Sequence, residues 1–162
     1  MSKPNIHVRF ATIDEVRSIA EVLLEAFVSY KPLYTSEAFA ATTLSAVEIK
    51  QRFDEGPTWV AVMDDRIVGT VAAMATENAL YIRSMAVLPG VRSRGIGKML
   101  LEQIESHAKS NGFRRMYLYS TPFLYDAINL YTRFGFIDKG EKHDLKGTPL
   151  ILMEKGLSDV WG

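Results

Sequence analysis

Apolar residues alternate with polar ones in some segments of this chain and recur every three or four residues in others, which predicts strands and helices respectively. Strands are expected at residues 6–10, 59–63, 67–75, 80–87, 116–119, 136–137 and 150–153. Helices are expected between Thr12 and Pro32, between Ser45 and Phe53, from Gly97 to Asn111, and between Thr121 and Gly135. Residues 30–43, rich in aromatic and small side chains, follow neither pattern.

Several helix boundaries carry their own signals. Thr12–Glu15 and Ser45–Glu48 each place a hydroxyl side chain three residues before a glutamate, which is a capping box at a helix start. Asn111-Gly112 is typical of a helix end. Thr121-Pro122 puts a capping residue before the residue type favoured at the first helical position, so we expect the last helix to begin at Pro122.

The order of these elements is typical of a mixed α/β sheet, because a hairpin run is followed by a helical crossover and a second strand–helix pair. A chain of 162 residues suits one domain, and it shows no repeat or linker. We therefore expect residues 1–162 to form a single unit. The tail, residues 155–162, is polar enough to fray, although Trp161 could pack on the rest.

Residues 86–100 read as a strand, a basic glycine-rich turn and a helix. The first amides of a helix have no partner inside it and its N-terminal end is positive, so this turn is a candidate anion site. Gly95 and Gly97 lack a Cβ and let a ligand approach the backbone. Charge for phosphate oxygens comes from Arg92, Arg94 and Lys98. The alternative is a basic surface turn that only caps the helix.

Two well-known phosphate loops do not fit this turn. The Walker pattern requires Ser or Thr after Gly-Lys, but Met99 follows Gly97-Lys98. The dinucleotide fingerprint requires a third glycine where Leu100 stands. The pattern that fits is Arg-x-x-Gly-x-Gly over residues 92–97, directly after a strand. This pattern resembles the acyl-CoA-binding motif of the GNAT acetyltransferase superfamily.

The resemblance implies a mixed, mostly antiparallel central sheet flanked by helices, with two splayed parallel strands and acyl-CoA in the gap between them. It implies acetyl-CoA as co-substrate. The residues implied in its binding are Met85, Ala86, Val87, Arg92, Ser93, Arg94, Gly95, Ile96, Gly97 and Lys98. The first three would act through their backbones, since an amide aimed at the thioester oxygen stabilises a tetrahedral intermediate. Leu124 stands where the family often has an asparagine that contacts pantetheine, so that hydrogen bond is expected to be missing or replaced.

Catalytic groups are suggested by a second matching stretch, Ala-x-x-Leu-Tyr-x-x-x-Gly-Phe at residues 127–136. There the family's tyrosine, here Tyr131, protonates the departing thiolate, which a phenol that is neutral at pH 7 can do. The alternative is a half-buried tyrosine on a helix face. Tyr81 stands where many members place a glutamate base. Either Glu77 works through water, or it is only a turn residue and the substrate amine is weakly basic.

The resemblance implies an acceptor pocket on the side opposite CoA, near residues 27–39 and Tyr81. Its candidate residues are Phe27, Tyr30, Tyr34 and Tyr81, although for Phe27 packing of the first helix onto the sheet is the favoured interpretation. Glu37 is the only acid within residues 27–39, so this stretch does not suit a polyamine or an aminoglycoside. It suits a small amine with an apolar body or the N-terminal end of a peptide.

Composition narrows the function classes. Positive and negative charges balance at 19 each, which argues against a nucleic-acid binder. No apolar run is long enough to span a bilayer and no signal-like core follows the first residues, so a cytoplasmic protein without a membrane partner is expected. The chain has no cysteine, and its 3 histidines lack metal-ligand spacing, so no metal is expected.

The leading hypothesis is an acetyl-CoA-dependent N-acetyltransferase that moves an acetyl group to a primary amine of a small molecule or peptide by direct attack. The alternative is a catalytically weak or inactive acyl-CoA-binding sensor of the same fold, which the missing strand glutamate favours and Tyr131 disfavours. A structural protein whose glycine loop only caps a helix is the third reading. The sequence leaves the acceptor and the oligomeric state open, a homodimer included.

Overall fold

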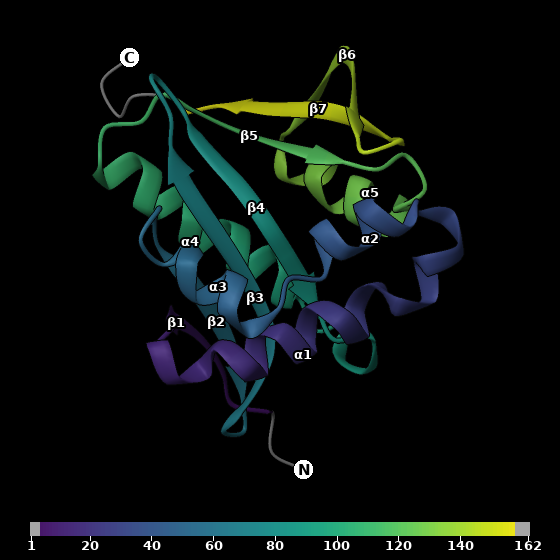
Figure 1. Ribbon diagram of the computed structural model, residues 1–162. Helices are drawn as coiled ribbons and strands as arrows, with labels where there is room; N and C mark the ends of the chain where they lie inside the picture. Colours follow the sequence, from purple (N-terminus) through teal and green to yellow (C-terminus); the bar gives the residue numbers. More distant parts are fainter. Residues whose placement is uncertain (1–3, 158–162) are drawn as a thin grey trace.

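The computed structural model describes residues 4–157 and contains one seven-stranded sheet (Figure 1). Its strands lie in the order β1-β2-β3-β4-β5-β7-β6, and only β4 and β5 are parallel neighbours within the part described. The strands are β1 Ile6–Phe10, β2 Thr58–Met63, β3 Arg66–Ala75, β4 Leu80–Val87, β5 Arg115–Ser120, β6 Ile137–Leu145 and β7 Thr148–Gly156. The predicted mixed, mostly antiparallel sheet with one central parallel pair is confirmed.

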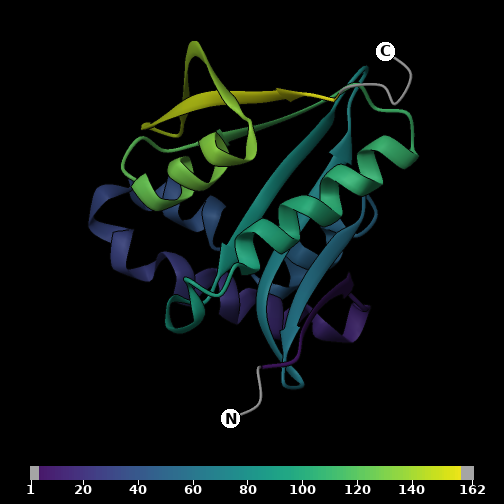
Figure 2. The same ribbon diagram turned by 180° about the vertical axis from the view of Figure 1, so that it is seen from behind.

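Helices cover both faces of the sheet. They are α1 Val16–Phe27, α2 Ser36–Thr42, α3 Ala46–Arg52, α4 Ile96–Ser110 and α5 Tyr125–Phe134, with 3₁₀ segments at Ile13–Glu15, Val28–Leu33 and Pro89–Val91. α1 and α3 lie against one face (Figure 1), and α4 and α5 lie on the opposite face (Figure 2). The sheet is therefore the middle layer of three.

The core forms where amphipathic helices bury one face each against the central strands. α1 contributes Ile19, Val22, Leu23 and Ala26, and α4 contributes Ile96, Leu100, Leu101, Ile104 and Ala108. These positions repeat at intervals of three and four, as burial of one helix face requires. Between them lies Trp59 of β2, whose ring is 1% exposed and packs on Phe10 and His107.

The central parallel strands separate soon after they meet. β4 and β5 are paired only at Leu80 with Met116 and at Tyr81 with Tyr117. Figure 1 shows the two strands diverging from this point toward the end of β4. The sheet is thus continuous at one end and open at the other, and the open end leaves one edge of β4 without a neighbouring strand.

Both predicted capping boxes are present, whereas the predicted start of the last helix is wrong. The Thr12 amide donates to Glu15 Oε1 at 2.8 Å, and the Ser45 amide donates to Glu48 Oε1 at 3.0 Å. α5 begins at Tyr125 instead of Pro122. The Thr121 carbonyl accepts from the Leu124 amide, so Thr121 and Pro122 belong to a turn that precedes the helix.

Two elements depend on tertiary contacts that the pattern does not reveal. α2 falls in the segment without a clear pattern, and Thr35 caps it by accepting from the Ala38 amide at 3.1 Å. β6 is much longer than residues 136–137, because its exposed, polar residues pair with β7 without a buried face. β7 extends through Gly156, so residues 155–156 do not fray, and Trp161 lies outside the described residues.

Among the described residues, none of the helices is long and apolar enough to cross a membrane.

Candidate functional site

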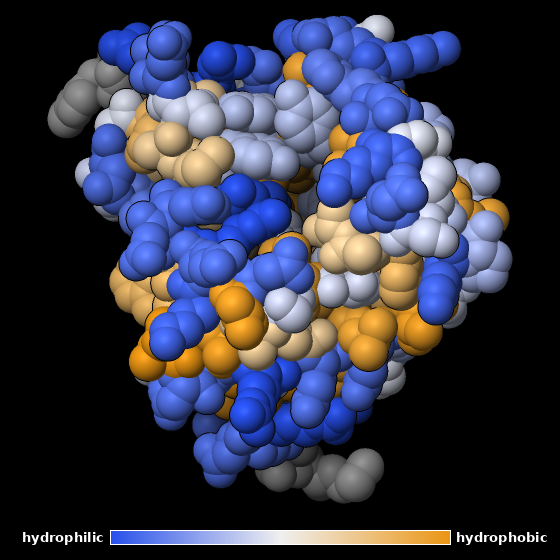
Figure 3. All heavy atoms as spheres, in the orientation of Figure 1, coloured by the Kyte–Doolittle hydropathy of each residue, from blue (hydrophilic) through white to orange (hydrophobic). Residues whose placement is uncertain are grey.

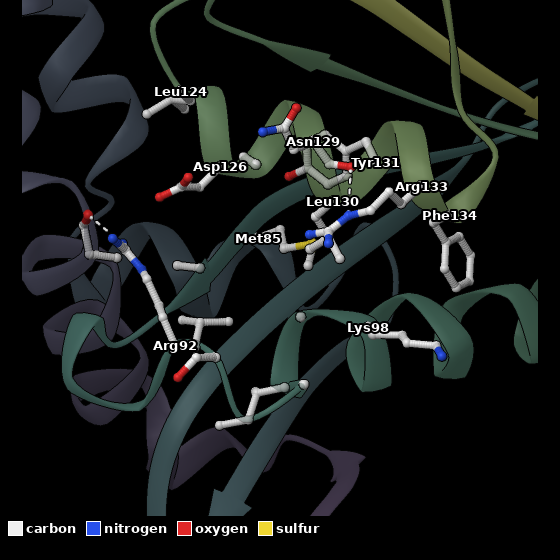
Figure 4. Close-up of a pocket in the computed structure, with 18 of the residues that line it drawn as sticks. Met85, Arg92, Lys98, Leu124, Asp126, Asn129, Leu130, Tyr131, Arg133 and Phe134 are labelled. Atoms are coloured by element: carbon white, nitrogen blue, oxygen red, sulfur yellow. Dashed lines mark hydrogen bonds between the residues drawn. The ribbon is translucent and has the colours of Figure 1, made fainter.

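A cavity of about 780 Å³ lies at the open end of the sheet, between α1, β4, the loop before α4, and α5 (Figure 4). It brings together most of the residues singled out in the sequence. The predicted residues that line it are Phe27, Tyr30, Met85, Ala86, Val87, Arg92, Ser93, Gly95, Ile96, Gly97, Lys98 and Tyr131. The glycine loop and the tyrosine motif, which lie far apart in the sequence, therefore face one cavity.

One wall of this cavity is the free edge of β4. Beyond Tyr81 the strand has no partner on the β5 side, so its backbone groups there are open to a ligand. The strand also carries a β-bulge, because Val71 of β3 lies opposite both Ser84 and Met85. Ser84 has a φ of 55°, a left-handed conformation that is unusual for serine. The bulge re-aims the backbone at Met85, where the strand enters the cavity.

A second wall is the N-terminus of α4. Gly95 is its N-cap residue, with a φ of +77°, and the first helical bond runs from the Met99 amide to the Gly95 carbonyl. The amides of Ile96, Gly97 and Lys98 therefore have no acceptor inside the helix. Such amides, at the positive end of the helix dipole, form a site for phosphate oxygens.

The two glycines of the loop serve different purposes. A Cβ on Gly95 would meet nothing within 4 Å, so the positive φ is what favours glycine there. A Cβ on Gly97 would lie 2.6 Å from Leu130 Cδ2. Gly97 therefore allows α4 to approach Leu130 of α5 closely, a contact that the sequence alone did not predict.

The Arg92 side chain forms a hydrogen bond with the end of α1. Its Nη2 donates to the Ala26 carbonyl at 3.1 Å, and Figure 4 shows the side chain extended toward α1. A cation at the C-terminal turn of a helix is favourable because the last carbonyls lack partners there. Arg94 is exposed and does not line the cavity, although Ser93 on one side and Gly95 on the other do. Of the predicted basic side chains, Arg92 and Lys98 thus remain at the cavity.

Tyr131 projects from α5 into the wall opposite the loop. Its side chain is 8% exposed and its ring packs edge-on against Phe136, with centroids 5.9 Å apart. Burial raises the pKa of the Tyr131 phenol above its usual value, and nearby Tyr34 raises it further. The hydroxyl is therefore protonated at neutral pH.

The exposed face of α5 adds polar groups that the sequence motifs did not single out. Asp126, Asn129 and Arg133 line the cavity mouth beside Leu124. The Arg133 Nε donates to the Asn129 carbonyl at 3.4 Å (Figure 4). Their spacing of three and four residues is the only sequence signal for this row, and any solvated helix face shows the same spacing.

Glu77 lies far from Tyr131. It follows β3 in the turn to β4 and lines a separate hollow of about 340 Å³ with Arg115, Tyr117 and Glu154. The eight residues of β4 separate this turn from Val87, a distance of roughly 23 Å at ~3.3 Å per residue. A single water cannot connect Glu77 to a thioester bound at the end of β4.

The residues predicted for the acceptor divide between two places. Phe27 and Tyr30 line the large cavity, and Tyr34 packs beside it in a buried cluster with Phe39. Tyr81 lies elsewhere, stacked on Tyr117 with ring centroids 5.0 Å apart. Phe27 and Tyr30 thus line the same cavity as the glycine loop, whereas Tyr81 does not line it and packs against β5.

The comparisons agree with this geometry. The family model described as "Acetyltransferase (GNAT) family" matches residues 17–136. The chain belongs to the GNAT family. An uncharacterized N-acetyltransferase of Escherichia coli, YjgM, is 27% identical over 134 residues, which are 79% of this chain and 80% of that protein.

Two relatives from Xenopus tropicalis match shorter segments. "Probable N-acetyltransferase 14" is 38% identical over 81 residues, 48% of this chain and 39% of that protein. "N-acetylaspartate synthetase" is 34% identical over 101 residues, 60% of this chain and 37% of that protein. This chain thus spans less than half the length of either relative.

Among solved structures, the PaiA N-acetyltransferase of Thermoplasma acidophilum, in complex with coenzyme A, superimposes with a TM-score of 0.78. It is 21% identical, and the match covers 94% of this chain and 99% of that one. An acetyltransferase of the GNAT family from Staphylococcus aureus also superimposes with a TM-score of 0.78, at 19% identity, over 95% of this chain and 100% of that one. At these identities the likeness establishes the fold.

The packing of Gly97 leads to a stability prediction. Gly97→Ala should lower the free energy of unfolding, because the new Cβ displaces Leu130, and overpacking typically costs about 1–3 kcal/mol. In a Leu130→Ala background the same substitution should stabilise the protein by up to about 1 kcal/mol, because alanine favours a helix over glycine. Urea denaturation of the four proteins measures this double-mutant cycle. An equal cost of Gly97→Ala in both backgrounds would contradict the assigned contact.

Proposed function

We propose that this protein is an acetyl-CoA-dependent N-acetyltransferase in which a primary amine attacks the thioester directly. The observation that carries the proposal is the convergence of a free strand edge, unpaired helix amides and a buried tyrosine on one cavity. Membership of the GNAT family and structural likeness to CoA-bound members support it.

In this proposal the cofactor lies along two walls of the cavity. Its diphosphate accepts hydrogen bonds from the amides at the start of α4, with Lys98 adding charge. Its pantetheine arm pairs with the backbone of β4 at residues 85–87, as an added strand would. Leu124 faces the same cavity and offers this arm an apolar contact without a side-chain hydrogen bond.

The chemical step then uses one backbone group and one side chain. The amine nitrogen bonds to the thioester carbon, and a β4 amide near the bulge stabilises the negative charge on the carbonyl oxygen. The carbon–sulfur bond breaks, and the Tyr131 hydroxyl gives its proton to the departing thiolate. The proton lost from the attacking nitrogen returns to the phenolate through water, so Tyr131 is regenerated.

The acceptor amine enters this step as its free base. Glu77 is too distant to remove a proton from it at the end of β4. Deprotonating an alkyl ammonium at pH 7 costs about 4–5 kcal/mol, whereas an α-amine costs only about 1.4 kcal/mol. The proposed acceptor is therefore a weakly basic amine, of which an α-amine is the simplest case.

Binding of CoA at the start of α4 is tested at Gly95. Gly95→Asp should weaken CoA binding at least tenfold more than Gly95→Asn, because both side chains tolerate the positive φ but only aspartate repels the diphosphate. Isothermal titration with CoA measures the two affinities. Equal affinities would show that the diphosphate does not bind at the start of α4.

Proton donation is tested at Tyr131. Tyr131→Phe should lower kcat by about 10²-fold or more while the affinity for acetyl-CoA stays within about twofold, because only the proton-donating hydroxyl group is removed. Tyr125→Phe is the matched control, since Tyr125 is on the same helix but 73% exposed. Thiol release and isothermal titration provide the two readouts. An unchanged kcat would mean that Tyr131 serves only in packing. If the unmodified protein bound acetyl-CoA without turnover, the alternative of an acyl-CoA-binding sensor would be favoured.

A further inference from the structure

Two arginines meet on the face of the sheet that carries α1 and α3. Arg52 is the last residue of α3, and its Nη1 donates to Ser84 Oγ at 3.1 Å. Arg83 is the preceding residue of β4, and it forms an ion pair with Glu55, which follows α3. Both guanidinium groups therefore lie beside the β-bulge at Ser84 and Met85.

The charges at this point do not balance. Glu55 is exposed and is the acid paired with Arg83, while none of the ion pairs within residues 4–157 includes Arg52. Burial and the neighbouring Arg83 lower the pKa of Arg52, whereas Glu55 and Glu48 partly offset this effect. Of the two guanidinium groups, only that of Arg83 thus has a direct carboxylate partner among the described residues.

Both arginines are also removed from water. The Arg83 side chain is 13% exposed, and its buried Nε has no hydrogen-bond partner among the described groups. Arg52 is half-buried, with a neutral hydroxyl as its side-chain acceptor. A guanidinium held in such surroundings is stabilised by a carboxylate, with which it forms charge-assisted, often bidentate hydrogen bonds.

Tyr81 lies two residues before Arg83 on β4, on the same face of the sheet. Tyr81 stacks on Tyr117 and packs edge-on against Tyr119, with ring centroids 5.0 and 5.8 Å apart. Figure 3 shows a recess near the centre of this face. The aromatic rings and the two arginines thus share one face of the sheet.

We propose that the acceptor is an amino acid whose carboxylate pairs with Arg52 and Arg83 while its amine faces the end of β4. This inference rests on the proposed function. Ser84, which accepts from Arg52, is adjacent to Met85, which lines the cavity proposed for acyl-CoA. In an α-amino acid only one carbon separates the amine from the carboxylate, so an amino acid anchored at the arginines would hold its amine beside Met85. The excess of positive charge at the two arginines also disfavours binding of polyamines.

The test compares acceptors that differ only in the carboxylate. Thiol release from acetyl-CoA is measured with the full chain for a panel of L-amino acids and the matching L-amino acid amides, at equal concentrations of free-base amine. The preferred amino acid should exceed its amide in kcat/KM at least tenfold, because the amide leaves the arginines unpaired. Arg52→Gln, which can still donate to Ser84, should lower this ratio at least fivefold.

Two further variants separate recognition of the carboxylate from support of α3. Arg52→Lys keeps the charge and should give an intermediate ratio. Lys50→Gln makes the same charge change at an exposed position of α3 and should keep the ratio of the unmodified protein.

Three results would overturn the inference. Amides accepted as well as amino acids by the unmodified protein would overturn it and leave the proposed function standing. An amino acid-to-amide ratio of kcat/KM that Arg52→Gln leaves unchanged would also overturn the inference without affecting the proposed function. Arg52 would then only hold α3 at the bulge. No thiol release with any member of either class would overturn this inference, and the proposed function would fall as well if carboxylate-free arylalkyl amines also released no thiol.

Discussion

The separation of β4 from β5 is the constraint on which the rest of the structure depends. Parallel neighbours normally satisfy each other's backbone groups along their whole length, but here the pairing stops at Tyr81 and Tyr117. Polar backbone groups that lack a partner are costly to bury, so the open edge has to face water or a ligand. The cavity of about 780 Å³ lies along this edge, and its position follows from the point at which the two strands part.

Neighbouring elements hold the opening in a fixed shape. The bulge at Ser84 bends β4, and the bond from Arg92 to the Ala26 carbonyl fixes the end of α1 beside the loop. Gly97 allows α4 to approach Leu130 of α5. None of these contacts is local in sequence. Each of them positions a wall of the cavity, so the site is a property of the tertiary structure.

Sequence patterns predicted those parts of the site that depend only on residues close together in the chain. The start of α4 and the buried face of α5 both follow from a few consecutive residues. The packing of Gly97 and the distance of Glu77 could not be predicted, because they depend on where α5 and β4 lie in space.

The start of α5 shows a related limit. Thr121 before Pro122 is a valid capping signal, but the segment forms a turn and the helix begins at Tyr125. The same holds for α2, since the contacts of Thr35 with Lys146 and Thr148 join residues more than 110 positions apart. Patterns in the sequence therefore indicated which residues line the cavity better than they indicated the distances between them.

In the proposed reaction, acetyl-CoA and the acceptor contact opposite faces of the sheet. The helix amides at the start of α4 would face the phosphates, while Arg52, Arg83 and the tyrosines lie on the side of α3. The bulge at Ser84 lies between them, with Ser84 bonded to Arg52 and Met85 lining the cavity. Donor and acceptor would thus approach β4 from opposite faces and meet at its free edge.

A crystal structure of the protein with acetyl-CoA tests the central claim most directly. The structure predicts diphosphate oxygens about 2.7–3.2 Å from the amide nitrogens of residues 96–98, and pantetheine bonded to the β4 backbone at residues 85–87. A cofactor bound elsewhere, or one that reaches this cavity without contacting either the α4 amides or the β4 edge, would contradict it.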